Sequence, residues 1–375
     1  MNKSEVRSFF PYLQNGIIYF NHAATGPFSK MVVDKINSLL KEKSQNKIDD
    51  FESFVKVMIE TKSLLAEMIN CTADRIAFTD NTTNGLIMLA NSIRWEKGDR
   101  ILLNDVEFPA NIYPFLNLQR LGVEIDFVKS QNGIVTADQI ISEIKPKTKL
   151  ISVSFVQFLS GYKIDVARLG NYCRTNNIIF CVDGIQGIGA LKIDVKKAKI
   201  DFLSCGTQKW LLGMQGLSFI YIDEELQKKI IPANIGWLSV NDAWNLLDYK
   251  LDLKSSAEVF QAGTLNTFGI YALNESLKIF RNFGFANIES EIINNSKYFI
   301  SMLNEKNIHC KLKNCEDTGL SGIVTINIEY AEKVFNNLAG KNIICSLREG
   351  LMRFAPHFYN TSQEIDLVVD ELQKK

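Results

Sequence analysis

The sequence predicts an α/β fold in which a mostly parallel sheet forms a large domain and a smaller α+β domain follows. Short apolar runs typical of strands alternate with longer periodic runs typical of helices over residues 16–255. Several strand candidates, such as Ile178–Val182, are apolar throughout, as expected for strands that helices cover on both faces. After Gly263 the pattern changes to long helical stretches followed by short strands.

The larger domain is expected to span residues 16–255. Its strand candidates are, in chain order, Ile17–Phe20, Arg75–Phe78, Arg100–Leu103, Glu124–Val128, Leu150–Phe155, Ile178–Val182, Asp201–Cys205 and Leu217–Ile222. Amphipathic segments between them are long enough to be crossover helices: Thr82–Ile93, Thr136–Ile144 and Val166–Asn176. Because such helices connect parallel strands, the sheet is expected to be mostly parallel.

The smaller domain is expected to combine residues 1–15 with residues 256–375. Its first part reads as two long helices, Leu265–Phe283 and Ala286–Asn304. Short strands and two helices are expected after them, in this order: Ser321–Ile328, the helix Ala331–Ala339, Ile343–Leu347, Met352–Phe354 and the closing helix Ser362–Leu372. No internal repeat or low-complexity linker separates the two parts.

Composition favours a small-molecule partner in a reducing compartment. The 42 basic and 42 acidic residues cancel, so no net field draws the chain to nucleic acid or to an anionic membrane. Seven cysteines, none in a Cys-x-x-Cys pair, together with the lack of a signal-like or membrane-length apolar run, predict a soluble cytoplasmic protein. The three histidines lie far apart in sequence, so no metal site is expected.

Two charged residues follow predicted strands at the edge where open α/β sheets bind ligands. Asp183 comes directly after the apolar run Ile178–Val182, where a carboxylate is costly unless a cation such as a protonated pyridine nitrogen pairs with it. Lys209 lies beside Trp210-Leu211-Leu212, where partial desolvation would lower its pKa and let the neutral amine attack an aldehyde. Taken singly, a turn aspartate and a snorkelling surface lysine are the better explanations.

Two further segments have the composition of a cofactor site. Thr79–Gly85 joins a strand to a helix and offers hydroxyls and free N–H groups to an anion, although capping by Asn81 or Thr82 explains it equally well. Glu107–Asn111 follows the strand near Ile101 and places Phe108 where a flat cofactor could stack. A core phenylalanine is the usual alternative.

In order and spacing, these residues resemble the class V aminotransferase family of fold-type I pyridoxal 5'-phosphate (PLP) enzymes, which includes cysteine desulfurases and isopenicillin epimerase-like relatives. The resemblance runs nearly end to end and implies a seven-stranded, mostly parallel sheet with a smaller α+β C-terminal domain. It is carried by seven segments: Tyr19–Pro27, Asn81–Thr83, Glu107–Asn111, Asp183–Gln186, Gln208–Gly213, Ala262–Asn266 and Arg353–Thr361.

The resemblance implies a role for each residue that would surround the PLP ring. Lys209 would hold PLP as a Schiff base and afterwards move the Cα proton of the substrate. Asp183 would pair with the pyridine nitrogen, Gln186 would contact the phenolic oxygen, and Phe108 would cover the ring.

The resemblance also implies the phosphate and substrate ligands. Thr82 and Thr83 would hold the phosphate, Thr207 would assist them, and Thr264 would reach it from a neighbouring subunit, which implies a homodimer with shared sites. Arg353, assisted by Arg348, would bind the carboxylate of a small amino acid, in a pocket expected to include Asn21 and His22 and, as further candidates, Phe28 and Trp237.

The chain departs from the desulfurase pattern at three places. Phe108 and Gln208 stand where desulfurases carry histidines, and Gly206 stands where they carry a phosphate-binding serine, which Thr207 or Ser204 would replace. Only four residues separate Arg348 from Arg353, so the mobile loop with a nucleophilic cysteine has no room. We expect Cys345, just before Arg348, to be a buried structural thiol.

These departures favour aminotransferase or carbon–sulfur lyase chemistry over persulfide-forming desulfuration. Desulfurase-like and epimerase activity remain alternatives, as does a catalytically silent protein that binds PLP or a partner. The joint presence of Asp183, Lys209 and Arg353 argues against a silent protein. A dinucleotide-dependent dehydrogenase would need a Gly-x-Gly-x-x-Gly turn after an early strand, and none is present there.

Overall fold

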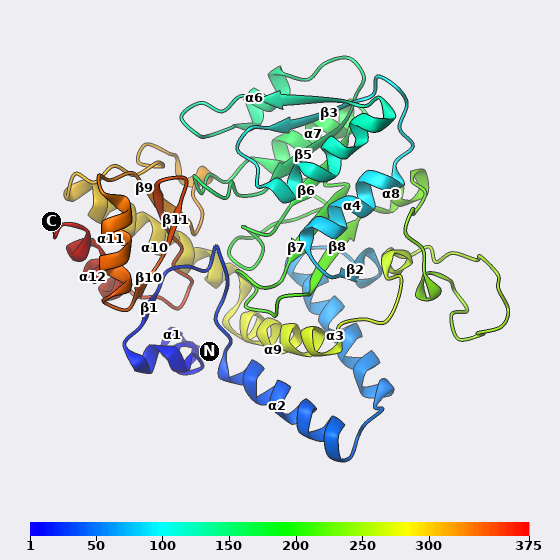
Figure 1. The fold of residues 1–375 in the computed structure, drawn as a ribbon, viewed down its shortest axis with the longest axis horizontal. Coiled ribbons are helices and arrows are strands. Elements are labelled where there is room, and N and C mark those ends of the chain that lie inside the picture. Colours follow the sequence, from blue (N-terminus) through cyan, green and yellow to red (C-terminus); the bar gives the residue numbers. More distant parts are fainter. Residues whose placement is uncertain (375) are drawn as a thin grey trace.

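A seven-stranded sheet forms the centre of the computed structural model, which describes residues 1–374 (Figure 1). Its strands lie in the order β2-β8-β7-β6-β5-β3-β4. Their bounds are β2 Ile76–Thr79, β3 Arg100–Asn104, β4 Glu124–Val128, β5 Thr148–Ser154, β6 Ile179–Asp183, β7 Phe202–Gly206 and β8 Ser218–Ile222. The pairs from β4 across to β7 are parallel, whereas β8 runs antiparallel to both β7 and β2. The predicted mostly parallel sheet of seven strands is therefore confirmed.

The two faces of this sheet bury different side chains because successive residues of a strand point to opposite sides. In β6, Phe180 and Val182 join one hydrophobic cluster and Cys181 joins the other. Five helices follow strands of the sheet: α4 Thr82–Ser92, α5 Tyr113–Leu116, α6 Ala137–Ser142, α7 Val166–Thr175 and α8 Glu224–Lys229. Coverage on both faces explains why a central strand such as β6 is almost entirely apolar.

The first predicted strand does not belong to the large sheet, so its assignment there was wrong. β1 (Ile18–Tyr19) pairs in parallel with β10 (Ile343–Ile344) in a separate two-stranded sheet. The chain then crosses to the large sheet, where the Gly26 N–H donates to Gln208 O over 2.7 Å. A Cβ on Gly26 would lie 2.4 Å from Lys209 O, so only glycine allows this close approach.

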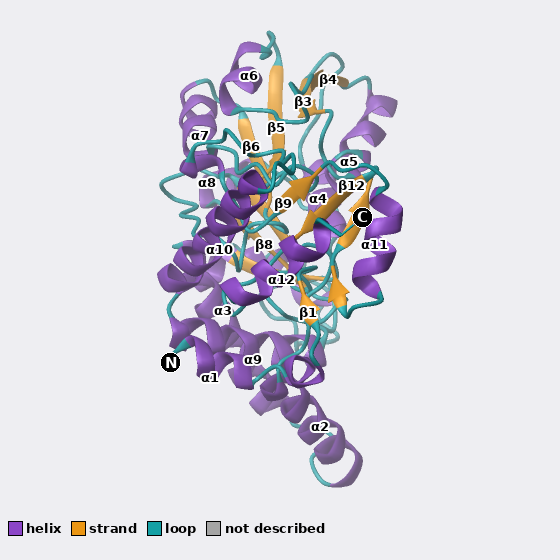
Figure 2. Ribbon diagram, turned by 90° about the vertical axis from the view of Figure 1, so that its left-hand side faces the viewer, coloured by secondary structure: helices purple, strands orange, loops and turns teal. Residues whose placement is uncertain are grey.

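Two helices that the sequence reading passed over lie between β1 and β2. They are α2 (Lys30–Gln45) and α3 (Phe51–Ile69), and both pack against the long helix α9 (Thr267–Phe283). The far end of α2 extends away from the rest of the molecule (Figure 2).

The C-terminal part builds a second, antiparallel sheet in the order β11-β12-β9. Its elements are α10 Phe285–Glu305, β9 Val324–Ile326, α11 Ala331–Ala339, β11 Ser346–Arg348, β12 Leu351–Phe354 and α12 Ser362–Leu372. The predicted strand Ile343–Leu347 is split into β10 and β11 at Cys345. The boundary at residue 255 between two domains stays a prediction.

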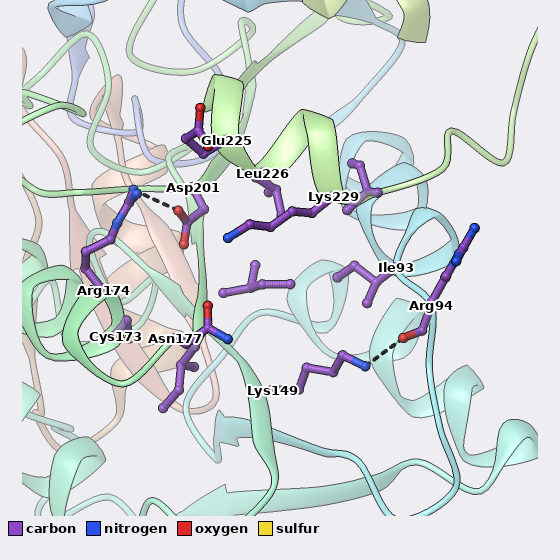
Figure 3. Close-up of a pocket in the computed structure, with 13 residues that line it drawn as sticks. Ile93, Arg94, Lys149, Cys173, Arg174, Asn177, Asp201, Glu225, Leu226 and Lys229 are labelled. Carbon is purple, nitrogen blue, oxygen red and sulfur yellow. Dashed lines mark hydrogen bonds and ion pairs between the residues drawn. The ribbon is translucent and has the colours of Figure 1, made fainter.

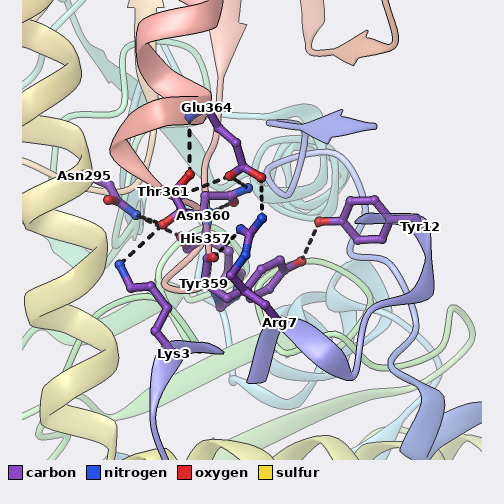
Figure 4. Close-up of polar contacts among 9 residues, drawn as sticks. All are labelled: Lys3, Arg7, Tyr12, Asn295, His357, Tyr359, Asn360, Thr361 and Glu364. Carbon is purple, nitrogen blue, oxygen red and sulfur yellow. Dashed lines mark hydrogen bonds and ion pairs between the residues drawn. The ribbon is translucent and has the colours of Figure 1, made fainter. Parts of the chain in front are cut away.

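The N-terminal helix α1 (Lys3–Ser8) is tied to this C-terminal part (Figure 4). Arg7 donates to Tyr359 O over 2.8 Å and pairs with the Glu364 carboxylate at 2.9 Å. Glu364 is only 8% exposed and also accepts from Asn360 and Thr361. These contacts join α1 to the C-terminal part of the chain. The sequence analysis grouped residues 1–15 with this part as the smaller domain, and that grouping stays a prediction.

Candidate functional site

Lys209 and Asp183 lie on neighbouring strand ends at the carboxyl edge of the large sheet. Register pairs Asp183, the last residue of β6, with Ser204 of β7, and Lys209 follows three residues after β7 ends. Burial raises the pKa of Asp183 to about 7, and burial lowers the pKa of Lys209 to about 8, with the attraction of Asp183 opposing that fall. A lysine with this pKa offers a far larger neutral fraction at neutral pH than an exposed lysine does.

The surroundings of these two groups fit PLP. Asp183 is 2% exposed and accepts the Ile185 N–H over 2.9 Å, and in residues 1–374 its carboxylate forms no ion pair, so a protonated ring nitrogen would supply its missing cation. Phe108 is 48% exposed, and its ring centroid lies 5.8 Å from Lys209 Nζ. An aromatic face is therefore open beside the amine that would hold the cofactor.

Gln186 is held in place from two sides. Its Nε2 donates to Ala23 O over 2.9 Å, and its Oε1 accepts from Trp210 Nε1 over 3.2 Å. Because a primary amide has two N–H donors, one remains for the phenolic oxygen that the prediction assigned to it.

The predicted phosphate site lies at the start of α4. Asn81 caps the helix by accepting the Asn84 N–H over 2.9 Å, and Thr82 and Thr83 form its first turn. The Thr82 hydroxyl accepts the Gly206 N–H over 2.9 Å, which fixes this turn against β7. The N–H groups of a helix start, with these hydroxyls, suit a phosphate.

The structure argues against Thr207 as a phosphate ligand. Thr207 is fully buried, and its hydroxyl donates to Met214 O and Leu217 O. The Ser204 hydroxyl donates to Thr82 O over 2.9 Å. Since a phosphate needs donors and both hydroxyl protons are used, neither residue replaces the serine of the desulfurases.

Arg353 presents a buried guanidinium without a carboxylate partner in the described part of the chain. It is 3% exposed, and its Nη1 donates to Phe158 O over 2.6 Å while Nε donates to Ser346 Oγ over 3.3 Å. Burial, followed by the repulsion of Arg348, lowers its pKa to about 10. Arg348 itself is exposed. A substrate carboxylate would compensate the buried charge.

His22 was wrongly predicted to contact the substrate. It is fully buried, with Nδ1 2.8 Å from Ala355 O and Nε2 2.7 Å from the Tyr359 hydroxyl, so both ring nitrogens are used inside the protein. Burial lowers its pKa well below the usual range. Neighbouring Asn21 keeps a buried Oδ1 with no partner in residues 1–374, so its predicted role stays open.

Thr264, the predicted contributor from a neighbouring subunit, is exposed and lies apart from the Lys209 cluster. It lines a hollow of about 340 Å³ together with Trp237 and Trp244. Trp237 itself is 43% exposed.

A separate cavity of about 290 Å³ lies at the amino edge of the sheet (Figure 3). Its cations are largely engaged: Lys149 binds Asp99 and Arg94 O, and Arg174 pairs with Asp201 at 3.0 Å. It contains none of the predicted site residues, so we place the candidate active site at the opposite edge.

Comparison with known proteins decides the family. The sequence pattern of the family described as Aminotransferase class-V matches residues 18–368. The chain belongs to the class V aminotransferase family. The predicted family, PLP-dependent enzyme class and PLP cofactor are therefore confirmed, whereas the roles of individual residues stay predictions.

This class V protein has similar relatives along nearly its whole length. An uncharacterized aminotransferase, YcbU, of Bacillus subtilis (strain 168) is 26% identical over 99% of this chain and 97% of its own length. Probable cysteine desulfurases of Ureaplasma parvum serovar 3 and Mycoplasma pneumoniae are 28% and 31% identical, over 99% and 76% of this chain and 97% and 72% of their own lengths.

Solved structures share the fold of this class V protein. A cysteine desulfurase from Thermococcus onnurineus NA1 gives a TM-score of 0.88 at 23% identity, covering 99% of this chain and 97% of its own. The cystine C-S lyase C-DES gives 0.87 at 22% identity, covering 97% and 98%. At such identities the likeness establishes the fold.

The two arginines of this class V protein are joined by a tight hairpin. Arg348 pairs with Leu351, and Ser346 pairs with Arg353, so only Glu349 and Gly350 form the turn. Both turn residues have positive φ, 48° and 74°, as a two-residue hairpin requires. Cys345 beside them is 4% exposed, and burial raises its pKa to about 12, as expected for a structural thiol.

Two further residues shape this site, and sequence reasoning gave no role to the first of them, Glu107. Glu107 precedes Phe108 and is buried among polar donors, one of which is Ser154 at the end of β5. A buried acid next to a predicted cofactor-stacking ring was the available signal. His357 accepts the Phe358 N–H at Nδ1, so its Nε2 donates to Trp210 O over 2.9 Å and supports the Lys209 loop.

Proposed function

We propose that this protein is a PLP-dependent carbon–sulfur lyase that removes the sulfur substituent from the β carbon of a cysteine-derived amino acid. The single observation that carries the proposal is the two-residue β11–β12 turn between Arg348 and Arg353. It leaves the substrate-carboxylate site of a class V enzyme without a loop that could carry a nucleophilic cysteine. Cys345, the nearest thiol in sequence, is buried in its protonated form.

The chain's own residues would carry out the proton transfers and the binding. PLP, when bound, supplies an aldehyde for the substrate amine and a conjugated ring that accepts the electron pair left at Cα. Lys209, with its pKa lowered to about 8, takes the proton from the substrate Cα. Asp183 holds a negative charge behind the ring nitrogen, and Arg353 orients the substrate carboxylate.

The leaving group would depart as an anion. As the Cα–H electron pair forms the new C=C bond, the Cβ–S bond breaks, and sulfur leaves with its electron pair; water then converts the released enamine to pyruvate and ammonia. Phe108 offers no proton, and the buried His22 and His357 have both ring nitrogens engaged. Substrates whose sulfur leaves as a stable anion, such as the disulfide cystine, are therefore favoured over free cysteine.

A product analysis tests the reaction type. The purified protein, reconstituted with PLP, is incubated with L-cystine, with S-aryl cysteine and with L-alanine plus a keto acid. Equal amounts of pyruvate and ammonia from the first two substrates are the expected result, with Lys209→Ala inactive. Amino transfer to the keto acid without pyruvate release from cystine would instead establish an aminotransferase, and a persulfide on the protein would establish a desulfurase.

We also propose that the enzyme is a homodimer with shared sites. Thr264 is exposed and lies beside an apolar loop in the same hollow as Trp237 and Trp244. The exposed apolar residues of this region are Trp237, Trp244, Leu246, Leu247, Tyr249 and Leu251. Such a patch is typical of surfaces that bind another protein. Light scattering after size exclusion should give twice the chain mass, and Leu247→Asp should lower it.

A cytoplasmic location is proposed on separate grounds. All seven cysteines are free thiols, as expected in a reducing compartment. In the described part of the chain, no helix has both the length and the apolar composition needed to cross a membrane. Cell fractionation with an antibody to the chain tests the location.

A further inference from the structure

The Glu107 carboxylate lies at a junction of three elements beside the active site. Its Oε1 accepts from Asn104 Nδ2 over 2.7 Å, at the end of β3, and from the Ser154 N–H over 2.8 Å, at the end of β5. Its Oε2 accepts from Asn111 Nδ2 over 3.1 Å and from the Ser154 hydroxyl. Four donors therefore surround this one buried carboxylate.

This carboxylate fixes the segment that carries Phe108. Glu107 directly precedes Phe108, and the short helical turn Pro109–Asn111 follows, so bonds to Glu107 and Asn111 hold Phe108 from both sides. Asn111 is fully buried, and its Oδ1 accepts from Ser152 Oγ over 2.6 Å. The Phe108 ring stays exposed and lies in a T-shaped arrangement with Phe158, at a centroid distance of 5.4 Å. The position of the Phe108 ring therefore depends on the hydrogen bonds of Glu107 and Asn111 on either side of it, and not on burial of the ring.

The same carboxylate acts on Asp183 through charge. Ser154, which binds Glu107, pairs with Asp183 across β5 and β6. Burial is the main cause that raises the pKa of Asp183, and the negative charge of Glu107 adds to the rise. The other titratable groups that face Asp183 are Lys209, which lowers its pKa, and the thiols of Cys181 and Cys205.

We propose that Glu107 is a positioning residue that holds Phe108 over the cofactor ring and supplies a fixed negative charge that keeps a proton between Asp183 and the ring nitrogen. The inference rests on PLP binding in the proposed function but not on the lyase reaction. It predicts two separable effects, one of geometry and one of charge, and two substitutions distinguish them.

Glu107→Gln keeps the length of the side chain, removes the charge and replaces one of the two accepting oxygens with an N–H donor. PLP is expected to bind about tenfold more weakly, the change that corresponds to about 1.4 kcal/mol. The pH midpoint of the visible absorption change of bound PLP is expected to fall by about half a unit or more, because every nearby proton is held less tightly. Glu107→Asp keeps the charge but is too short for all four donors; it should keep the midpoint and weaken the visible circular dichroism of bound PLP.

Glu364→Gln is the matched control. Glu364 is a comparably buried carboxylate with several donors, but it lies in the C-terminal part (Figure 4), so its loss should lower Tm without changing either PLP readout. Wild-type affinity and midpoint in Glu107→Gln would overturn the charge effect, and unchanged dichroism in Glu107→Asp would overturn the positioning effect. If Glu107→Gln does not fold, the dichroism of Glu107→Asp still decides whether Glu107 positions Phe108. A wild type that binds PLP but releases no pyruvate would refute the proposed lyase reaction. The PLP readouts of the Glu107 variants would still test the role of Glu107, because they do not depend on that reaction.

Discussion

Replacing Arg353 with methionine should lower activity strongly while changing stability little. The guanidinium is 3% exposed and has no carboxylate partner among residues 1–374. Burial lowers its pKa from 12.5 to about 10, which corresponds to roughly 3 kcal/mol of unfavourable free energy in the folded state. Because the depressed pKa belongs to a base, the penalty is present at every pH below about 10 and is relieved above it.

Two hydrogen bonds oppose the gain from removing this charge. The bonds to Phe158 O and Ser346 Oγ would be lost, and at about 1.5 kcal/mol each, the lower end for a bond that involves a charged group, they cancel the gain from removing the charge in Arg353→Met. The apoprotein should therefore melt at a temperature close to that of the wild type.

Catalysis should change far more than stability. A hydrogen bond to a charged group contributes about 1.5–3 kcal/mol, so kcat/KM for an amino acid substrate should fall about 10- to 150-fold. Arg353→Lys should also be impaired, because lysine keeps the charge but not the planar fork. A substrate amine without a carboxylate should react equally with wild type and Arg353→Met. The reasoning is refuted if kcat/KM of Arg353→Met for the amino acid stays within twofold of wild type.

Three further outcomes follow from the same structure. Because the pKa of Lys209 is lowered to about 8, the rate at which the apoprotein takes up PLP should rise with pH, with a midpoint near 8. Asp183→Asn should move this midpoint to lower pH, since the charge of Asp183 raises the pKa of the lysine. A midpoint near 10.5 in the wild type would contradict this prediction. Cys345→Ser should keep lyase activity, measured as pyruvate release, and its loss would point to a persulfide route. Gly350→Ala should lower Tm by strain at φ 74°, at a cost of about 1 kcal/mol, whereas Gly340→Ala, at a negative φ, should not.

The sequence predicted the central strands of the large sheet well because they are covered on both faces and therefore largely apolar. The run Ile178–Val182 differs by only one residue at each end from β6, Ile179–Asp183. β1 was misplaced because a four-residue apolar run says nothing about its pairing partner. Only the contact with Ile343–Ile344, far along the chain, decides its place.

The residues of the candidate site were predicted well where the residue type limits the possible chemistry. They were predicted poorly where the role depends on the direction in which a side chain forms its hydrogen bonds. Asp183 and Lys209 each had a structural explanation when taken singly, but their order and spacing in the class V pattern pointed to a cofactor site, and the structure brings both to one edge. Thr207 has a suitable hydroxyl, but its proton is donated to Leu217 O. His22 is likewise engaged by Ala355 and Tyr359. No sequence pattern states where a hydroxyl or imidazole points.

The visible absorption spectrum of the purified protein with PLP, recorded beside that of Lys209→Ala, tests the central claim most directly. We expect a visible band for the wild type that is lost in Lys209→Ala and changes when L-cystine is added, and borohydride should remove this band while fixing the cofactor covalently to Lys209. A wild type without this band after incubation with PLP, or a Lys209→Ala variant that keeps it, would contradict the account.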